Sequence, residues 1–242
     1  MRSLGRYILF MGKLFTNREP FRVYLKLFFD ECILIGVDSL VIVVLVSVFI
    51  GAVMCLQTAF NLVSPLIPDY VISLVVRDMT LIEVAPTFTA IVFAGKVGSN
   101  IAGTIGTMKI TEQVDALEVM GINSASYLVL PKILAGLIMY PALVIIAGFL
   151  AIYGGYVAGT LAGVITAQEY IYGIRSDFMD FNVFFALIKA LVFSFLIVSI
   201  SAYKGYFTEG GALEVGISST KAVTNSCIAV LLADFILAQF LI

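Results

Sequence analysis

Two long stretches without a charged residue, 39–68 and 133–168, constrain this chain more than any other feature. A helix needs about 20 consecutive apolar residues to cross the hydrocarbon core of a bilayer, and both stretches are longer than that. Strands of a membrane barrel would alternate polar and apolar residues, whereas residues 41–46 read Val-Ile-Val-Val-Leu-Val. Only 12% of the residues are charged, against about 25% in soluble domains. The sequence therefore predicts an all-α integral membrane protein.

Charge and hydropathy divide the chain into an N-terminal segment, 1–34, and one membrane domain, 35–242. The N-terminal segment mixes basic and aromatic residues at helical spacing, so we expect an amphipathic helix on the membrane surface, interrupted at Pro20. A solvated cytosolic tail is the alternative. Within the domain we expect five membrane spans, at about 35–62, 71–97, 134–161, 182–203 and 223–241.

Lysine and arginine residues are distributed unevenly between the segments that connect the spans. Of the 14 in the chain, 11 lie on the side of the N-terminus, and the other three are Arg77, Arg175 and Lys189. Because cytoplasmic loops carry the excess of these residues, we place the N-terminus in the cytoplasm. Five spans then leave the C-terminus on the outer side of the membrane.

Charged residues also occur inside the expected spans. Glu83 lies in the second span and Lys189 in the fourth. A charge at membrane depth is costly unless it is paired or solvated, so Glu83 should line a substrate path or form a structural ion pair with Lys189, unless it lies at the membrane interface. Pro86 should loosen the helix beside it and free a carbonyl. Arg77 and Asp78 are expected near the outer end of the same helix, where they would be solvated or would reach the membrane interface or a partner domain.

Small residues recur every four positions in the third span and so share one ridge of a helix: Ala147, Ala151, Gly155, Gly159 and Gly163. Such ridges let helices approach closely in lipid. We expect this ridge to pack against another helix, either within the subunit or at a dimer interface.

A polar connector between the second and third spans, 98–131, contains a predicted short helix at 111–120. Thr111 is suited to cap its start, and Gly121 is placed to end it. The helix would present acidic and apolar side chains together: Glu112, Val114, Asp115, Leu117, Glu118 and Met120. This combination favours docking to another protein, and a solvated loop is the alternative.

Several kinds of chemistry lack their usual residues. The chain has no histidine, the commonest metal ligand and general base, and we predict no metal site and no catalytic residue. It has no Gly-x-x-x-x-Gly-Lys-Ser/Thr loop, so we expect no cofactor here, and any ATP to be bound by a partner. A net charge of −2 without a basic patch argues against a nucleic-acid partner. A lipid enzyme would need convergent acid and base groups, and a channel would need a polar pore.

Three motifs resemble the MlaE family of ABC transporter permeases: FAGKVGS at 93–99, EQVDALEVMG at 112–121 and YLVLPK at 127–132. Shorter matches extend the resemblance over about 35–242: Gly51, Leu56-Gln57, Leu187-Ile188-Lys189, Lys204-Gly205-Tyr206 and Gly216-Ile217-Ser218. The resemblance implies a permease subunit in a bacterial inner membrane that moves phospholipid between this membrane and the outer envelope. It also implies a permease homodimer, a cytosolic ABC ATPase dimer and a hexameric MCE-domain protein on the outer side.

The resemblance further assigns roles to individual residues. Side chains from the first, second and fourth spans would form the lipid path: Met54, Thr58, Asn61, Leu62, Ile82, Glu83 and Lys189. The connector helix would be a coupling helix seated on the ATPase, with contributions from Glu112, Gln113, Asp115, Leu117, Glu118, Met120 and Gly121. The N-terminal segment would match the interfacial helix of the family.

Two positions depart from the family pattern. Ile82 stands where the best-studied branch has an arginine, and Asn182 stands where it has an acid. These differences put a headgroup role for an Arg–Glu pair in question, with Arg77 as a candidate replacement about one and a half turns away. Some family members carry sterols or other lipids. A permease for another lipid or small apolar solute, or a channel without ATP coupling, is therefore the alternative function.

Overall fold

The structure is a computed structural model and describes residues 2–14, 20–62 and 68–241. These residues are almost entirely helical and include no strand, which confirms the all-α class. The α-helices are α1 (Arg2–Lys13), α2 (Phe21–Cys32), α3 (Asp38–Asn61), α4 (Tyr70–Met79), α5 (Thr89–Phe93), α6 (Ser99–Ile110), α7 (Gln113–Val119), α8 (Ser124–Leu161), α9 (Ala167–Arg175), α10 (Asp180–Tyr206) and α11 (Ala212–Leu241). Three π-helical segments join some of them into longer rods: η1 (Ile33–Val37), η2 (Thr80–Phe88) and η3 (Ala94–Gly98).

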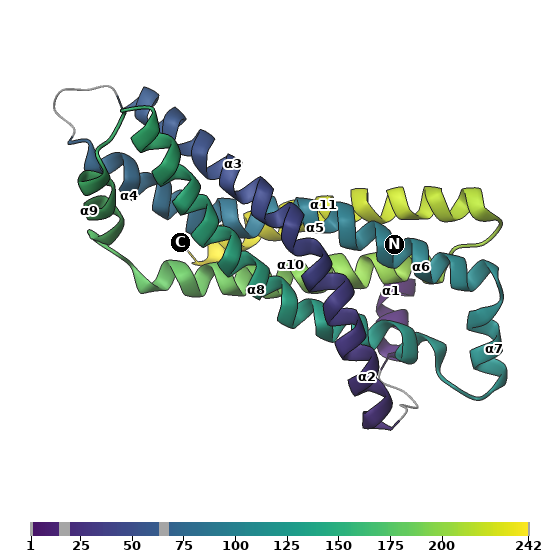
Figure 1. The fold of residues 1–242 in the computed structure, drawn as a ribbon. Coiled ribbons are helices and arrows are strands. Elements are labelled where there is room, and N and C mark those ends of the chain that lie inside the picture. Colours follow the sequence, from purple (N-terminus) through teal and green to yellow (C-terminus); the bar gives the residue numbers. More distant parts are fainter. Residues whose placement is uncertain (1, 15–19, 63–67, 242) are drawn as a thin grey trace.

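Five helical rods in the described residues are long and apolar enough to cross a membrane, which is the number that hydropathy predicted: Arg22–Asn61, Tyr70–Ile110, Ser124–Leu161, Asp180–Tyr206 and Ala212–Phe240. Residues 22–34 continue directly into the first rod, and residues 98–110 of the expected connector belong to the second. Pro20 precedes α2, where a break was expected. Figure 1 shows the rods side by side, with α9 near one end of the bundle and α7 at the other.

Residues 98–110 remain helical because the bundle packs around them. Ser201 occupies the space that a side chain at Gly98 would fill, and Val215 does the same at Gly106. These glycines resemble loop residues in the sequence. In the bundle they let α6 approach α10 and α11 closely, which is how small residues act in membrane helices.

The most extensive helix contact joins α3 and α8. A Cβ atom on Gly51 would overlap the carbonyl oxygen of Ala151, and one on Gly154 would overlap that of Val48. The predicted ridge thus packs within the subunit, along its buried members Ala147, Ala151, Gly155 and Gly159. Gly163 does not take part, because it lies beyond α8 and is exposed, with a φ of 68°.

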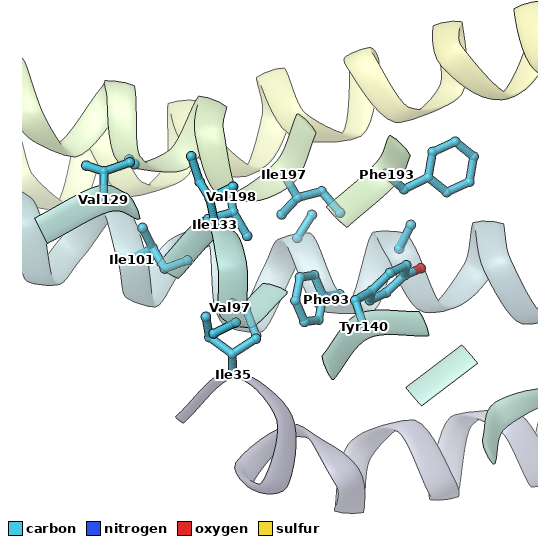
Figure 2. Packing of buried hydrophobic residues seen from close by; sticks show 14 of the residues in the cluster. Ile35, Phe93, Val97, Ile101, Val129, Ile133, Tyr140, Phe193, Ile197 and Val198 are labelled. Atoms are coloured by element: carbon cyan, nitrogen blue, oxygen red, sulfur yellow. The ribbon is translucent and has the colours of Figure 1, made fainter. Parts of the chain in front are cut away.

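The largest core cluster lies between the second rod, α8 and α10. Figure 2 shows buried side chains from these elements packed together, among them Phe93, Tyr140 and Phe193. The rings of Phe93 and Tyr140 have centroids 4.7 Å apart. Aromatic pairs at this separation stabilise a core beyond the area that they bury.

Helix α1 packs against the end of α10. Phe10 is buried, and its ring contacts those of Tyr203, Tyr206 and Phe207. The Tyr7 hydroxyl lies 2.7 Å from that of Ser199, and burial raises the pKa of the Tyr7 phenol above its usual value. Residues 2–14 therefore form a docked helix rather than a solvated tail, while residues 1 and 15–19 of the predicted N-terminal segment lie outside the described part.

Candidate functional site

A hollow of about 360 Å³ lies between the end of α3 and α4. It is lined by Met54, Gln57, Thr58, Asn61, Leu62, Val75 and Met79. Four of the residues predicted for a lipid path, Met54, Thr58, Asn61 and Leu62, therefore meet at one surface. The wall is mostly apolar, and its exposed polar groups include the amides of Gln57 and Asn61. Neither amide hydrogen-bonds to another described residue.

Sequence reasoning missed Gln57, Val75 and Met79 as lining residues. Helical spacing carried a signal for all three. Residues 54, 57, 58 and 61 follow the i, i+3, i+4, i+7 pattern of one helix face, and residues 75 and 79 are one turn apart. Ile82 and Glu83, predicted for the same path, do not line this hollow but come next along the same rod.

Lys189 on α10 is completely buried and holds two carboxylates. Its Nζ atom lies 2.7 Å from Oε1 of Glu83 and 2.7 Å from Oδ1 of Asp234 on α11. It also lies 4.6 Å from the centroid of the Phe185 ring. The structure thus brings Glu83 and Lys189 together as predicted and joins η2, α10 and α11 at one point. We call Glu83, Lys189 and Asp234 the three-charge cluster.

Asp234 was not singled out from the sequence. Its signal was available, because it is the one charged residue between Ala222 and the end of the chain. A lone acid in an apolar span requires a partner for the same reason as Glu83. Lys189 was already assigned to Glu83 as its partner, so a second carboxylate for the same lysine was not considered.

Pro86 explains how Lys189 gains a further acceptor. A proline has no N–H to donate to the carbonyl four residues earlier, which here belongs to Ile82. Lys189 Nζ donates to that Ile82 carbonyl at 3.0 Å. The carbonyl of Pro86 itself accepts a hydrogen bond from the Tyr140 hydroxyl at 2.6 Å. The predicted loosening of this helix is thus confirmed, and it appears as the π-helical segment η2.

The expectation that Arg77 lies at a solvated helix end is wrong. Its side chain is 1% exposed, and its guanidinium lies at the C-terminal end of α9. Arg77 Nη1 donates to the carbonyls of Ile174 at 2.8 Å and Ser176 at 2.6 Å, and Nη2 donates to that of Asp177 at 3.2 Å. Its Nε pairs with Asp78 at 2.9 Å. A cation here satisfies the carbonyls that a helix end leaves unpaired.

Arg77 therefore does not replace the arginine absent at position 82. Among the described residues, its hydrogen bonds go to Asp78 and to the backbone of residues 173–177, and none goes to Glu83. Asn182 takes part in the same group, because its amide donates to Asp78 at 3.4 Å. Sequence reasoning missed this arrangement since backbone carbonyls leave no residue-type signal.

The predicted connector helix is present as α7, at the end of the bundle opposite α9 (Figure 1). It covers Gln113–Val119 instead of 111–120. Thr111 does not cap it, because the Thr111 hydroxyl donates back to the carbonyl of Thr107 at the end of α6. Gly121 ends the helix as expected, with a φ of 80° and an N–H that donates to the Glu118 carbonyl.

The two faces of α7 differ. Val114 is fully buried and Leu117 is half-buried, so these two apolar side chains anchor the helix to the bundle rather than face outward. The outward side chains include two large apolar ones, Val119 at 89% and Met120 at 66% exposure. Exposed polar residues flank them: Glu112, Gln113 and Asp115, the last of which pairs with Lys109 at 2.6 Å.

Glu118 is exposed, and its carboxylate is also hydrogen-bonded within the subunit. Its Oε1 atom accepts hydrogen bonds from Ser124 Oγ at 2.8 Å and from Tyr206 Oη at 2.9 Å. These two donors lie at the start of α8 and at the end of α10. The carboxylate thus links three helices, and a motion of α7 would be transmitted directly to the other two.

Comparison with known proteins supports the family resemblance that the sequence motifs indicated. The family model described as Permease MlaE matches residues 28–240. A probable ABC transporter permease protein of Rickettsia bellii is 35% identical over 98% of this chain and 92% of its own length. The intermembrane phospholipid transport system permease protein MlaE of Haemophilus influenzae is 29% identical over 99% and 92%. Protein trigalactosyldiacylglycerol 1, chloroplastic, of Arabidopsis thaliana is 34% identical over 65% of this chain and 45% of its own.

Proposed function

Because this chain belongs to the MlaE family of ABC transporter permeases, we propose that it moves phospholipid between a bacterial inner membrane and the outer envelope. A separate ATPase subunit drives the transport, and the permease itself hydrolyses nothing. The relative named for phospholipid transport supports phospholipid as the cargo.

The hollow between α3 and α4 carries this proposal. Its apolar wall, which includes Met54 and Met79, suits an acyl chain. The amides of Gln57 and Asn61, which bond to no other described residue, suit the polar part of a lipid. Ile82 and Glu83 continue this surface along the second rod, with Lys189 behind Glu83. An amphipathic lipid such as a phospholipid needs both kinds of surface at once.

Helix α7 is proposed as the dock for the ATPase. Val119 and Met120 provide an exposed apolar contact, and Gln113 and Asp115 provide polar ones. When the ATPase subunits close, the push on α7 passes through Glu118 to α8 and α10. The rods then tilt and change the shape of the hollow at the far end.

The proposed assembly contains two copies of this permease, two cytosolic ATPase subunits and an outer MCE-domain hexamer. In this assembly the N-terminus is cytoplasmic and the C-terminus periplasmic, as the distribution of Lys and Arg favours. Five rods from one chain enclose little space, and this supports the use of a second copy.

Affinity purification in a mild detergent, with mass spectrometry of the proteins and lipids recovered, tests this proposal. We expect an ABC ATPase, an MCE protein and phospholipid in fixed proportion to the permease. Val119→Asp should lose the ATPase, because it places a charge in the apolar contact. Leu161→Asp is the matched control, since Leu161 is 83% exposed at the other end of the bundle. Recovery of the permease without ATPase or phospholipid, also after crosslinking in whole cells, would refute the proposal.

A further inference from the structure

The three-charge cluster has an unbalanced charge. Two carboxylates, Glu83 and Asp234, share the single ammonium group of Lys189, which leaves one net negative charge. Among the described residues, the other hydrogen-bond partner of Glu83 is the neutral hydroxyl of Thr87, at 3.3 Å from Oε2. A net charge in a membrane span interacts strongly with other charges, because little water is present to screen it.

The exposed part of the cluster is the negative part. The Lys189 side chain is 0% exposed and that of Asp234 is 16% exposed, whereas that of Glu83 is 44% exposed. A molecule that reaches the cluster therefore meets the Glu83 carboxylate and not the ammonium group behind it. Oε2 of Glu83 retains acceptor capacity, because its one hydrogen bond to a described residue is the long contact to Thr87.

The described residues that line the hollow, and residues 80–82 between it and Glu83, carry no positive charge to offset this carboxylate. Met79, in the wall of the hollow, precedes Glu83 by four residues on the same rod, and Ile82 beside it is apolar. The described residues that line the hollow have neutral polar groups, namely two amides and a hydroxyl. Arg77 is the cation of this rod closest in sequence to Met79, and it is buried against α9.

We propose that this permease favours phospholipids whose headgroup bears a positively charged amine, of the ethanolamine type, over anionic phospholipids. The amine binds the Glu83 carboxylate, completes the charge balance of the cluster and donates hydrogen bonds to Oε2. An anionic headgroup would instead approach an exposed carboxylate without a cation to receive it. This inference rests on the proposed phospholipid transport and specifies its cargo.

The test measures which lipids stay bound to the purified complex. The permease complex is isolated in mild detergent from a membrane that contains phospholipids with ethanolamine headgroups and anionic phospholipids with glycerol headgroups. Bound lipid is then quantified by headgroup. We expect the ethanolamine-to-glycerol ratio to exceed that of the membrane about threefold, as for a partly hydrated ion pair. Glu83→Gln should bring the ratio back to that of the membrane, because an amide carries no charge for the amine to balance. Glu169→Gln, at a half-buried acid on α9 outside the cluster, is the matched control and should keep the preference.

A second variant guards against a folding defect in Glu83→Gln. Ile82→Lys adds a cation beside Glu83 and leaves the ion pairs of Lys189 in place, so it should shift the bound lipid toward anionic headgroups. Bound phospholipid without a headgroup preference, or with the same preference in Glu83→Gln and wild type, overturns this inference and leaves the proposed function standing. Absence of phospholipid from the wild-type complex overturns both.

Discussion

At the scale of single residues, Arg77 provides the charged contact that joins α4 to the C-terminal end of α9. Arg77→Ala would leave the carbonyls of Ile174 and Ser176 and the carboxylate of Asp78 without their cation. Removal of one partner from a buried charged group typically costs about 3–5 kcal/mol. We expect a large drop in the thermal midpoint in detergent and rapid protease cleavage near α9. Arg175→Ala, at an exposed residue of the same helix, should change stability by no more than about 0.5 kcal/mol.

Glu169 makes the start of α9 sensitive to pH. Its carboxylate accepts hydrogen bonds from the hydroxyl and the backbone N–H of Thr166, and these bonds lower the pKa of Glu169. The cap therefore stabilises α9 above the ordinary carboxyl pKa of about 4.3, and this stabilisation is lost as pH falls through the lowered folded pKa. Amide exchange at 167–170, corrected for intrinsic rates, should speed up over that interval. Glu169→Gln should show no such interval, because an amide does not titrate there.

The charged residues show what sequence reasoning can and cannot find. The pair of Glu83 and Lys189 was predictable, because the cost of an isolated charge in lipid demands a partner and few candidates exist. Arg77 was placed wrongly, because its partners are backbone carbonyls 97 to 100 residues later in the chain. The pairing of Asp234 with Lys189 was not predicted. Hydropathy shows that an acid in a span needs a partner, but it does not show that two acids share the same one.

At the scale of helices, the contact between α3 and α8 depends on residues with no side chain. Gly51→Ala should separate the two helices, because its methyl group would overlap the carbonyl oxygen of Ala151. Overpacking of this kind typically costs about 1–3 kcal/mol, which a lower thermal midpoint would reveal. Gly95→Ala is the matched control. Nothing lies within 4 Å of its new methyl group, so it should be neutral or slightly stabilising.

Helix α7 is held by a hydrogen-bond group that a double-mutant cycle can measure. Tyr206→Phe and Ser124→Ala each remove one donor to Glu118, and each should cost about 0.5–3 kcal/mol. Their effects should not add, because both act on one carboxylate oxygen, and the coupling energy should be about 0.5 kcal/mol or more. Additive losses in thermal unfolding would show that Glu118 does not join α8 and α10 to α7.

The same helix shows the limits of a local pattern. Its existence and its end at Gly121 followed from the sequence. Its faces did not, because Val114 and Leu117 look like docking residues until α6 and α8 cover them. Val119, which is more exposed than either, was not singled out for docking. Residues 98–110 were misplaced for a related reason, since their glycines favour a helix only where neighbouring helices pack closely against them.

At the scale of the whole molecule, Lys189 is the residue on which three helices converge. Lys189→Met should leave the mostly buried carboxylate of Asp234 and the partly exposed one of Glu83 without a cation, and loss of the partner of a buried charge costs about 3–5 kcal/mol. We expect little folded protein in detergent, measured as the monodisperse fraction in gel filtration. The triple variant Lys189→Met/Glu83→Gln/Asp234→Asn should recover much of that fraction, because no uncompensated charge remains. Equal yields from the single and triple variants would show that the charge imbalance is not what destabilises the protein.

The overall fold was the most predictable property of this chain. The number of membrane rods followed from the apolar stretches alone, since apolar segments of this length have few alternatives to crossing a bilayer. The ends of the rods did not follow, because a helix continues into water for as long as neighbours and caps support it.

The position of the three-charge cluster along the second rod has a mechanical consequence. Glu83 lies between Met79, which lines the hollow, and Ile110, where the rod ends next to α7. We expect a rod that is fixed by ion pairs at an intermediate point to rotate about that point. A push on α7 would then move the wall of the hollow in the opposite direction. The distances of the two arms from Glu83 set how much of a displacement at one end reaches the other.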